Sequence, residues 1–335
     1  MDGFAAHWPG AVAVSGGGDS VALMHLLARW AKAGRKPAPA VLVVDHGLRA
    51  QSKSEARMVA RKAKALGLDT TVLTVRAPMP ASGIEAAARD ARYRLIGGWM
   101  ARRKFTTLYV GHSQDDQAET FLLRLARGSG LDGLAAMRPL APWPDADHAG
   151  LVLARPLLGM TRADLRAYLA AQGQDWIEDP MNDDPRFYRV RMRKLAPALA
   201  EAGLTPARIA LAAAHMADAR AALEMVTAAV IERAVRAAPR ESRQPGLLLD
   251  PDALAAAPRE LSLRALAALL QTVSGAPYRP RFQALERLHV AISAATPMAG
   301  QTLSGCRIGP APATERLFGP RTLKLTREKP RKGQI

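Results

Sequence analysis

The sequence contains one cysteine, no long apolar run and few acidic residues for its length. Because Cys306 stands alone, a disulfide framework, a cysteine-rich zinc site and a C-x-x-C redox motif are all excluded. No stretch approaches the ~18 uninterrupted, strongly apolar residues of a transmembrane helix. Residues 1–4 do not begin a basic segment followed by an apolar run, so we expect no signal peptide. We therefore predict a cytoplasmic protein without a membrane partner.

The shortage of acidic residues leaves the chain strongly basic. Lysine and arginine number 47 against 30 aspartates and glutamates, which gives a formal net charge of +17 at pH 7. A charge of that size and sign favours a polyanionic partner such as nucleic acid or a membrane surface. The 335 residues, of which 49% are hydrophobic and 23% charged, have the composition of a folded protein and the length of about two domains.

Short apolar runs and helical patterns alternate through the first half of the chain. The runs are apolar on both faces, as in strands buried beneath helices, and lie at 11–14, 41–44, 71–75, 107–110 and 151–153. Helical patterns separate them at 20–32, 53–66, 84–103 and 114–125. This alternation predicts an α/β fold with a doubly wound, mainly parallel sheet covered by helices on both faces. Such sheets bind ligands at the carboxyl ends of their strands.

The second half predicts a helical region followed by a small basic region. No glycine or proline interrupts residues 207–238, and an apolar stripe runs through them at steps of three and four. We expect the stripe to pack in a core; it comprises Ile209, Ala212, Met216, Ala219, Leu223, Val226 and Val230. Further helical patterns cover 259–272 and 281–294, and eight basic but two acidic residues occur from Arg307 onward. We predict domains at 1–197, 198–298 and 299–335.

A glycine-rich loop joins the first predicted strand to the first predicted helix. Its sequence is Ser15-Gly16-Gly17-Gly18-Asp19-Ser20. Glycines allow a tight turn and a close approach to a ligand, and the amides of such a loop and of the following helix suit a phosphate group. The serine hydroxyls add donors, and the Asp19 carboxylate can cap the helix or hold the water shell of magnesium. A glycine-rich turn that binds no ligand is the alternative.

This loop resembles the S-G-G-x-D-S pyrophosphate loop of the N-type ATP pyrophosphatases. The resemblance implies a doubly wound α/β domain that cleaves ATP between its α and β phosphates and adenylates a substrate oxygen. No Walker A loop competes with it, because the dipeptide Gly-Lys does not occur. A second glycine motif at 128–133 fits G-x-G-x-x-G, but it follows a helical stretch and not the strand that a dinucleotide-binding loop requires.

Further segments narrow the resemblance to one family of these enzymes. They are 44–49, 84–93, 111–120, 127–131, 155–158 and 176–182. Over residues 11 to about 197 their combination is similar to that of the tRNA(Ile)-lysidine synthetases. The resemblance implies that ATP, with Mg²⁺, adenylates the C2 carbonyl oxygen of the wobble cytidine in tRNA(Ile) with a CAU anticodon. The ε-amine of free L-lysine then displaces AMP to form lysidine.

Acidic and histidine side chains follow the second and fourth predicted strands. Asp45 and His46 come after the second strand, and His112 comes after the fourth. At the start of the next helix, Asp115 and Asp116 lie four and three residues before a third acid, Glu119, so the three can share one helical face. These acids either complement the helix dipole or hold magnesium beside the ATP phosphates. His112 either contacts ribose or phosphate, or is a structural polar residue.

With the resemblance, these positions become site residues. We predict Asp45, Asp116 and Glu119 as catalytic groups, since a carboxylate can orient the lysine amine or accept its proton. We predict Asp19, Asp115 and Asp116 as metal ligands. The predicted ATP site comprises Ser15, Gly16, Gly17, Gly18, Asp19, Ser20, His46 and His112.

Two groups of basic residues lie within the same region. Glu85, Arg89 and Arg92 follow at steps of four and three, which predicts one helix face; a surface ion-pair face is the alternative to a nucleotide or tRNA contact. Basic residues are denser at 186–194, with two aromatic residues among them, which favours phosphate contact over a solvated charge run. We predict that tRNA contacts the helical linker 198–298 and is bound by the region 299–335 and by Arg89, Arg92, Arg186, Arg189, Arg191, Arg193 and Lys194.

Two positions depart from the family pattern. Met181 stands where the family usually has serine, and Val190 follows Arg189 where the family usually has asparagine. Methionine and valine cannot form the hydrogen bonds of serine and asparagine. The resemblance therefore says less about the local geometry at these two positions.

Three other functions fit parts of the pattern. A tRNA sulfurtransferase of the same fold commonly needs catalytic cysteines or an iron–sulfur cluster, which a lone Cys306 outside the α/β half does not supply. A small-molecule amidating synthetase has no need for a charge of +17. A nucleic-acid-binding protein with a vestigial nucleotide loop would not need the loop at 15–20 and the acidic residues to be intact.

Overall fold

The computed structural model describes residues 1–45, 52–76, 83–178, 188–239, 241–242, 244–276, 278–294, 296 and 298–328. Their contacts divide the chain into two compact units, Met1–Asp218 and Ala219–Ile335. The three domains expected from the sequence remain a prediction. Of the residues discussed above, His46, Met181 and Arg186 lie outside the described residues.

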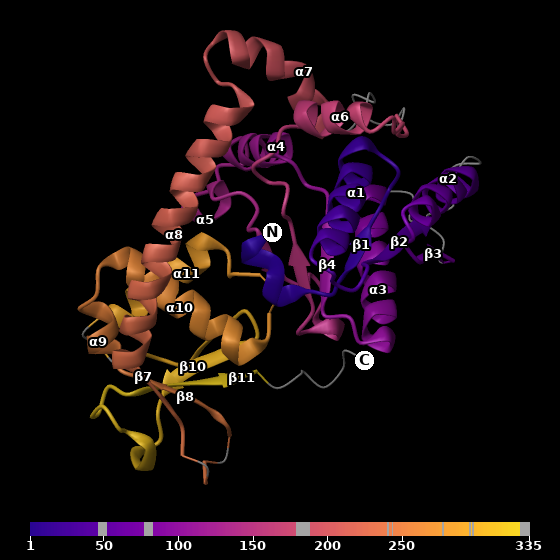
Figure 1. The fold of residues 1–335 in the computed structure, drawn as a ribbon. Coiled ribbons are helices and arrows are strands. Elements are labelled where there is room, and N and C mark those ends of the chain that lie inside the picture. The colour runs from indigo at the N-terminus through magenta and orange to yellow at the C-terminus, as the bar shows by residue number, and fades with distance from the viewer. Residues whose placement is uncertain are drawn as a thin grey trace. The chain divides into compact units, whose positions relative to one another are not determined.

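A six-stranded sheet forms the centre of the first unit (Figure 1). Its order is β3 (Thr70–Thr74), β2 (Ala40–Asp45), β1 (Ala11–Ala13), β4 (Thr107–Val110), β6 (Val152–Ala154) and β5 (Leu140–Pro142). Neighbouring strands are parallel except β5, which runs antiparallel to β6 at one edge. The predicted α/β fold with a mainly parallel sheet is therefore confirmed.

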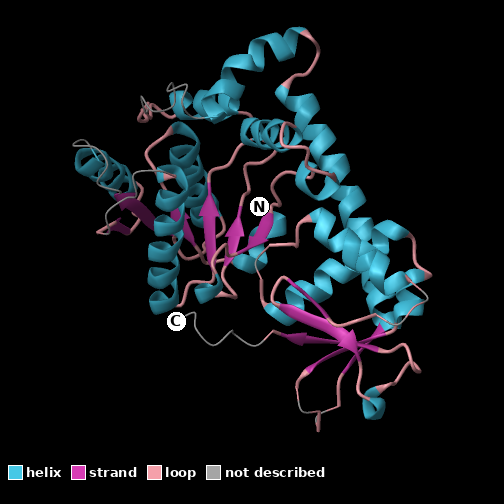
Figure 2. Ribbon diagram, turned by 180° about the vertical axis from the view of Figure 1, so that it is seen from behind, coloured by secondary structure: helices cyan, strands magenta, loops and turns pink. Residues whose placement is uncertain are grey.

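Helices cover both faces of this sheet (Figure 2). Val12 and Tyr109 belong to a core shared with α1, α2 and α6, whereas Leu42 and Leu108 belong to a second core shared with α3. Buried strands that are apolar on both faces require such a double covering. The helices of this unit are α1 (Gly18–Ala33), α2 (Ser52–Ala65), α3 (Ile84–Arg103), α4 (Gln114–Leu125), α5 (Leu131–Leu134), α6 (Arg162–Ala171), α7 (Tyr188–Glu201) and the first part of α8 (Pro206–Ala234).

The strand order reverses beside β1. The chain moves outward from β1 through β2 to β3, and then places β4 on the other side of β1. Open α/β sheets bind ligands beyond the carboxyl ends of the two strands that flank such a reversal. The glycine-rich loop leaves β1 at this point and Gly111 leaves β4. A Cβ on Gly111 would lie 2.8 Å from the backbone oxygen of Asp19. Only glycine at position 111 therefore lets the chain after β4 approach the start of α1 this closely.

The second unit contains a five-stranded antiparallel sheet and helices packed against it. The sheet order is β7 (Val235–Ala237), β8 (Gly246–Leu249), β11 (Leu323–Arg327), β10 (Cys306–Pro310) and β9 (Gln301–Leu303). Its helices are α9 (Pro251–Ala255), α10 (Arg259–Ser274), α11 (Phe282–Ser293) and the end of α8. Cys306, Ile308, Leu323 and Leu325 share one core with α10 and α11. The C-terminal strands are therefore integral to this unit.

The long helix differs from the expected one at its end and on its face. Helix α8 ends at Ala234 and not at residue 238, because residues 235–237 pair with β8. Ile209 and Val230 are buried as expected, but Val226 is 45% exposed and Thr227 is buried instead. The predicted stripe is therefore not one continuous buried face. No described helix is long and apolar enough to cross a lipid bilayer.

Candidate active site

Hydrogen bonds to Ser20 shape the glycine-rich loop. The Ser20 Oγ donates to the Gly17 carbonyl (2.9 Å) and accepts from the Ser15 amide (3.2 Å). Gly16 has a φ of +96°, and a Cβ there would collide with Ile177 Cδ1. The Ile177 amide in turn donates to the Gly16 carbonyl (2.9 Å). The loop conformation therefore depends on glycine at position 16 and on the segment that follows α6.

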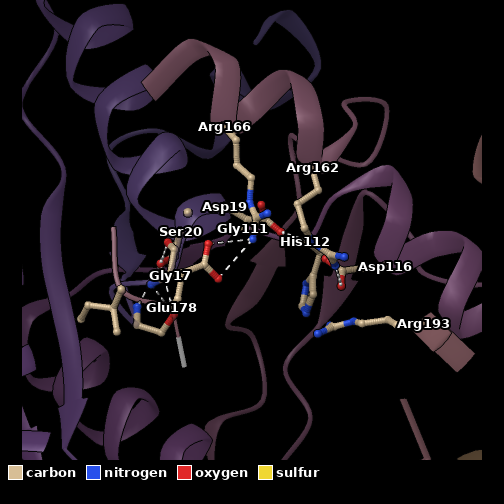
Figure 3. Close-up of a pocket in the computed structure, with 13 residues that line it drawn as sticks. Gly17, Asp19, Ser20, Gly111, His112, Asp116, Arg162, Arg166, Glu178 and Arg193 are labelled. Carbon is tan, nitrogen blue, oxygen red and sulfur yellow. Dashed lines mark hydrogen bonds and ion pairs between the residues drawn. The ribbon is translucent and has the colours of Figure 1, made fainter. Parts of the chain in front are cut away.

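A cavity of about 760 Å³ lies over this loop (Figure 3). Loop residues form one wall, the end of β4 and the start of α4 form another, and three arginines from α6 and α7 point into the space. The lining residues are Ser15, Gly17, Gly18, Asp19, Ser20, Gly111, His112, Asp116, Arg162, Arg166, Ile177, Glu178 and Arg193. The structure thus brings most of the predicted ATP site together with Asp116 and Arg193.

Arg162, the first residue of α6, joins the carboxylates that the sequence indicated. Its guanidinium nitrogens lie 3.4 Å from Asp19 Oδ2, 3.2 Å from Asp116 Oδ1 and 3.4 Å from Glu119 Oε1. Its backbone amide donates to Asp115 Oδ2 (2.7 Å). Burial acts to lower the pKa of Arg162, but the surrounding carboxylates outweigh burial and raise that pKa above its usual value. One cation therefore holds residues of α1, α4 and α6 together.

The two carboxyl oxygens of Asp116 have different partners. Its Oδ2 accepts hydrogen bonds from the amide (2.9 Å) and the hydroxyl (3.0 Å) of Ser113 and so caps α4. Its Oδ1 faces Arg162 in the cavity. One side chain therefore both caps α4 and faces the cavity, and the cap is a structural role that the sequence alternatives of helix dipole or magnesium did not include.

A second arginine, Arg193 of α7, pairs with Glu119. Its Nε lies 2.6 Å from Glu119 Oε1, and its Nη2 lies 3.4 Å from Oε2. We refer to Asp19, Asp115, Asp116 and Glu119 as the acidic cluster. The four carboxylates carry more negative charge than the two guanidiniums balance, so the cluster can bind a further cation. Burial, followed by the Asp116 and Asp115 carboxylates, raises the pKa of Asp19 although Arg162 opposes the shift.

The acidic cluster also decides whether magnesium fits. Within the described part of the chain, no three histidine, cysteine or acidic side chains form a preformed metal site. Asp19 and Asp116 nevertheless present carboxylate oxygens to one cavity, and Mg²⁺ commonly binds through one or two carboxylates together with substrate phosphates. The donor set therefore fits a magnesium ion that is held jointly with a nucleotide.

A smaller cavity of about 190 Å³ adjoins the acidic cluster. Asp115, Glu119, Arg162 and Arg193 form its polar part. The remaining wall is mainly apolar and comes from α4, α7, α8 and the α7–α8 connection: Ala118, Leu122, Met192, Ala196, Leu199, Leu204, Pro206 and Ile209. Such a space suits a ligand with an aliphatic chain and a polar or charged end.

Sequence reasoning missed Arg162, Arg166 and Glu178. Arg166 pairs with Glu178 at 3.1 Å, and Glu178 also accepts a hydrogen bond from Trp176 Nε1 (2.7 Å). Glu178 lies within the segment 176–182 that supported the resemblance, so that segment contained a signal. The two arginines are four residues apart on a helix, a spacing that many solvent-exposed helices share.

Other predicted residues lie away from the larger cavity. Asp45 ends β2, is 5% exposed and does not line the cavity. Arg89 and Arg92 of α3 lie over the ring of Tyr93, at 5.0 and 5.8 Å from its centroid. Arg191 and Lys194 are exposed on α7, and the side chain of Arg189 is outside the description. Val190 is buried, so apolar packing occupies that position.

The amino-acid sequence is similar to those of known proteins. The PP-loop domain family matches residues 7–199. The tRNA(Ile)-lysidine synthase of Ruegeria pomeroyi is 42% identical over 297 residues, which are 89% of this chain and 68% of that protein. The tRNA(Ile)-lysidine synthase of Rhodopseudomonas palustris is 40% identical over 329 residues, 97% of this chain and 92% of that protein.

Two further similarities differ in closeness. The tRNA(Ile)-lysidine synthase of a Bradyrhizobium species is 45% identical over 261 residues, 76% of this chain and 71% of that protein. The solved structure of the U34-tRNA thiolase NcsA from Methanococcus maripaludis aligns with 62% of this chain and 70% of its own, with a TM-score of 0.49 and 15% identity, too distant to bear on activity. On the sequence match across nearly its whole length, the chain belongs to the tRNA(Ile)-lysidine synthase family of PP-loop proteins.

Proposed function

We propose that this protein ligates L-lysine to C2 of the wobble cytidine in tRNA(Ile) with a CAU anticodon. The C2 carbonyl oxygen attacks the α-phosphorus of ATP, and pyrophosphate leaves. The ε-amine of lysine then attacks C2, and AMP leaves with the former carbonyl oxygen. The observation that carries this proposal is the 40% identity to a tRNA(Ile)-lysidine synthase over 97% of the chain. Family membership makes the chain an ATP-dependent ligase.

The glycine-rich loop is our candidate for the pyrophosphate part of ATP. Its amides and the Ser15 hydroxyl are donors at the N-terminus of α1, where the helix dipole favours negative charge, and Ser20 shapes the loop through its bond to Gly17. Arg162 and Arg166 enter the same cavity from α6 and can balance the charge of the departing pyrophosphate. His112 at the end of β4 is our candidate for a further nucleotide contact; His46 remains one by resemblance.

Asp19 and Asp116, with Asp115 beside them, would hold Mg²⁺ together with the phosphates. The metal ion would supply neutralisation of the charge that develops on the phosphate oxygens. In the structure, Arg162 supplies positive charge at the same carboxylates. Arg162 thereby keeps Asp19 and Asp116 directed into the cavity.

We place the lysine side chain in the smaller cavity. Its methylene groups would contact the apolar wall, and its ammonium group would lie near the carboxylates of Asp115 and Glu119. The ammonium must lose a proton before the nitrogen can attack, and a carboxylate of the cluster would accept it. Asp116 and Glu119 are therefore our candidate catalytic groups, together with Asp45 by resemblance.

The tRNA would contact basic side chains of the catalytic unit and of the region 299–335. Arg89 and Arg92 on α3, and the basic residues at 186–194, remain our candidates for phosphate contacts. Arg193 differs from the others because it already pairs with Glu119. We therefore expect Arg193 to affect the lysine step more than the affinity for tRNA. The reaction would take place in the cytoplasm, where tRNA, ATP and lysine meet.

Nucleoside analysis tests the function directly. The full chain is incubated with ATP, Mg²⁺, isotopically labelled lysine and tRNA(Ile) with a CAU anticodon, and the tRNA is digested to nucleosides. We expect labelled lysidine at the wobble position, with AMP and pyrophosphate formed in equal amounts. A tRNA with uridine at the wobble position serves as the control. Pyrophosphate release without labelled nucleoside, or sulfur incorporation in its place, would exclude this function.

A further inference from the structure

We propose that Arg155 is a positioning residue that fixes the tautomer of His112 in the ATP cavity. Arg155 follows β6 and His112 lies two residues beyond β4. These strands are parallel neighbours, with Tyr109 opposite Ala154, so both side chains start from the same edge of the sheet. The Nε of Arg155 donates to Nδ1 of His112 at 3.2 Å. This inference rests on the proposed role of His112 as a nucleotide contact.

Arg155 is held rigidly enough for this task. It is 7% exposed, its Nη1 donates to the Arg138 carbonyl (2.9 Å), and its backbone amide donates to the Pro139 carbonyl (2.8 Å). Burial, and then the nearby charges of Arg89 and Arg124, lower the pKa of Arg155. Even so, an arginine side chain remains protonated in proteins. The guanidinium therefore stays a fixed, positively charged donor beside the imidazole.

The chemistry of the pair determines where the proton of His112 lies. A guanidinium has donors only, so the Nδ1 that receives its hydrogen bond must present a lone pair. In a neutral imidazole the proton is then on Nε2, which makes that nitrogen a donor. The opposite tautomer would direct an N–H of His112 at an N–H of Arg155. A doubly protonated ring would place two positive charges in contact.

This tautomer suits the proposed ligand. His112 lines the cavity above the glycine-rich loop, where the phosphate and ribose oxygens of ATP are acceptors. A donating Nε2–H can bond to such an oxygen, whereas a lone pair on Nε2 would repel it. Arg155 would thus act on ATP through His112 without entering the cavity wall itself. A purely structural arginine would instead only hold the chain at residues 138–139.

Nitrogen NMR of the imidazole rings in the full chain measures the tautomer without any substrate. The chain has seven histidines, and the His112→Ala variant assigns the signals of His112. We expect a protonated Nε2 and an unprotonated Nδ1 in the wild type. In Arg155→Met we expect the fraction of the Nε2–H form to fall, and in Arg155→Lys, which retains a donor, to recover in part. An unchanged His112 tautomer in Arg155→Met would overturn the proposal.

Arg124→Met is the matched control. Arg124 is a partly exposed arginine of the same unit, and its Nη1 also donates to backbone carbonyls, those of Gly133 (2.8 Å) and Ala136 (2.9 Å). Its loss should lower the melting temperature but leave the His112 signals as in the wild type. A tautomer change in Arg124→Met equal to that in Arg155→Met would show a general loosening of the fold, which contradicts a specific role for Arg155.

A double-mutant cycle adds the link to ATP. We expect Arg155→Met and His112→Ala each to raise the KM for ATP by ~10-fold, the scale of one lost hydrogen bond. The double variant should be no worse than His112→Ala alone, because Arg155 acts through that ring. Losses that multiply would mean that Arg155 acts independently and would overturn the proposal. If no lysidine forms in any sample, the proposed function fails while the NMR result still decides the tautomer.

Discussion

Asp19 carries a charge that its surroundings disfavour. Burial is the main cause of its raised pKa, and the neighbouring carboxylates of Asp116 and Asp115 add to the shift. Arg162 offsets these effects only in part, although it lies 3.4 Å away. A group whose charged form is disfavoured in the folded state lowers stability wherever it is ionised. A carboxylate that binds a cation together with a polyphosphate would explain why the protein keeps this loss of stability.

Asp19→Asn should therefore raise the stability of the protein but lower its rate of AMP formation. Because the folded-state pKa is raised, the wild type loses stability as pH rises from the ordinary value of 3.8 through the folded pKa. The neutral variant has no such loss, so its advantage in melting temperature should be absent at lower pH and constant above the folded pKa. AMP formation should fall by ~10²-fold. A variant that is less stable than the wild type at neutral pH would refute this account of Asp19.

Arg162→Met removes the cation that three carboxylates share. We expect the free energy of unfolding to fall by ~2–3 kcal/mol, less than for a fully buried pair because the side chain is 21% exposed. Mg²⁺ should restore more stability to this variant than it adds to the wild type, since the freed carboxylates gain a divalent partner. Thermal unfolding with and without Mg²⁺ measures both effects. Equal responses of the two proteins to Mg²⁺ would argue against a metal at Asp19 and Asp116.

At the scale of elements, the first turn of α4 combines a structural and a chemical role in adjacent atoms. Ser113 is fully buried at the N-cap and exchanges hydrogen bonds with Asp116. The other oxygen of Asp116 faces the cavity. Substitutions at the two ends of this capping box should therefore separate stability from catalysis.

Asp116→Asn keeps the shape of the side chain and one acceptor oxygen but removes the charge. We expect normal folding and a loss of Mg²⁺-dependent adenylation by ~10²-fold. Ser113→Ala is the converse: it should lose ~1 kcal/mol of stability through the cap and retain its specific activity. Melting curves and AMP formation on both variants test the separation. If Asp116→Asn melted early but kept its activity, helix capping alone would explain this residue.

The smaller cavity depends on the packing of α7 against α4. Ala196→Leu should fill part of the cavity beside its apolar wall. Because the added methyl groups would take the space of the lysine methylenes, the KM for lysine should rise by ~10-fold or more. The AMP-forming half-reaction should change little, because the larger cavity is not obstructed. Ala198→Leu, at an exposed position on the same helix, is the control and should leave both steps unchanged. A larger effect on ATP than on lysine would place lysine elsewhere.

At the scale of the whole molecule, the basic C-terminal residues are carried by a folded sheet. Deletion of residues 301–335 would remove buried Cys306, Ile308, Leu323 and Leu325 from the core of the second unit. Such a deletion would unfold that unit and could not report on tRNA binding. Charge removal at exposed positions of β10 and β11 keeps the core and tests the charge alone.

Arg307→Gln with Arg327→Gln makes this change, since both side chains are exposed. If both contact tRNA phosphates, the slope of log affinity against log salt should become shallower by ~0.7–0.9 per contact, and ATP binding should stay unchanged. Arg102→Gln with Arg103→Gln, at exposed positions on α3, removes the same charge and should leave the slope as it is. Equal slopes for the wild type and both double variants would show that Arg307 on β10 and Arg327 on β11 do not contact the tRNA phosphates.

Features formed by consecutive residues could be predicted from the sequence. The bounds of α3 and α4 agree with the structure, and the glycine-rich loop follows a buried strand and runs into a helix as predicted, although α1 already begins at Gly18. Apolar runs of strand length required a doubly covered sheet, and the motifs were specific enough to indicate the family. The predicted end of α8 was wrong. The helical pattern of the sequence continues to residue 238, but residues 235–237 pair with β8 and form a strand.

Contacts between distant segments were decided by the tertiary structure. Arg162 meets Asp19 across 143 positions of the chain, Arg193 meets Glu119 across 74, and Arg155 meets His112 across 43. Periodicity states which face of an element is apolar, but not which charged side chains oppose one another after the strands are ordered. The partners of the acidic cluster and the apolar wall of the smaller cavity therefore follow from strand order and helix packing, whereas the loop that is our candidate for ATP binding follows from local sequence.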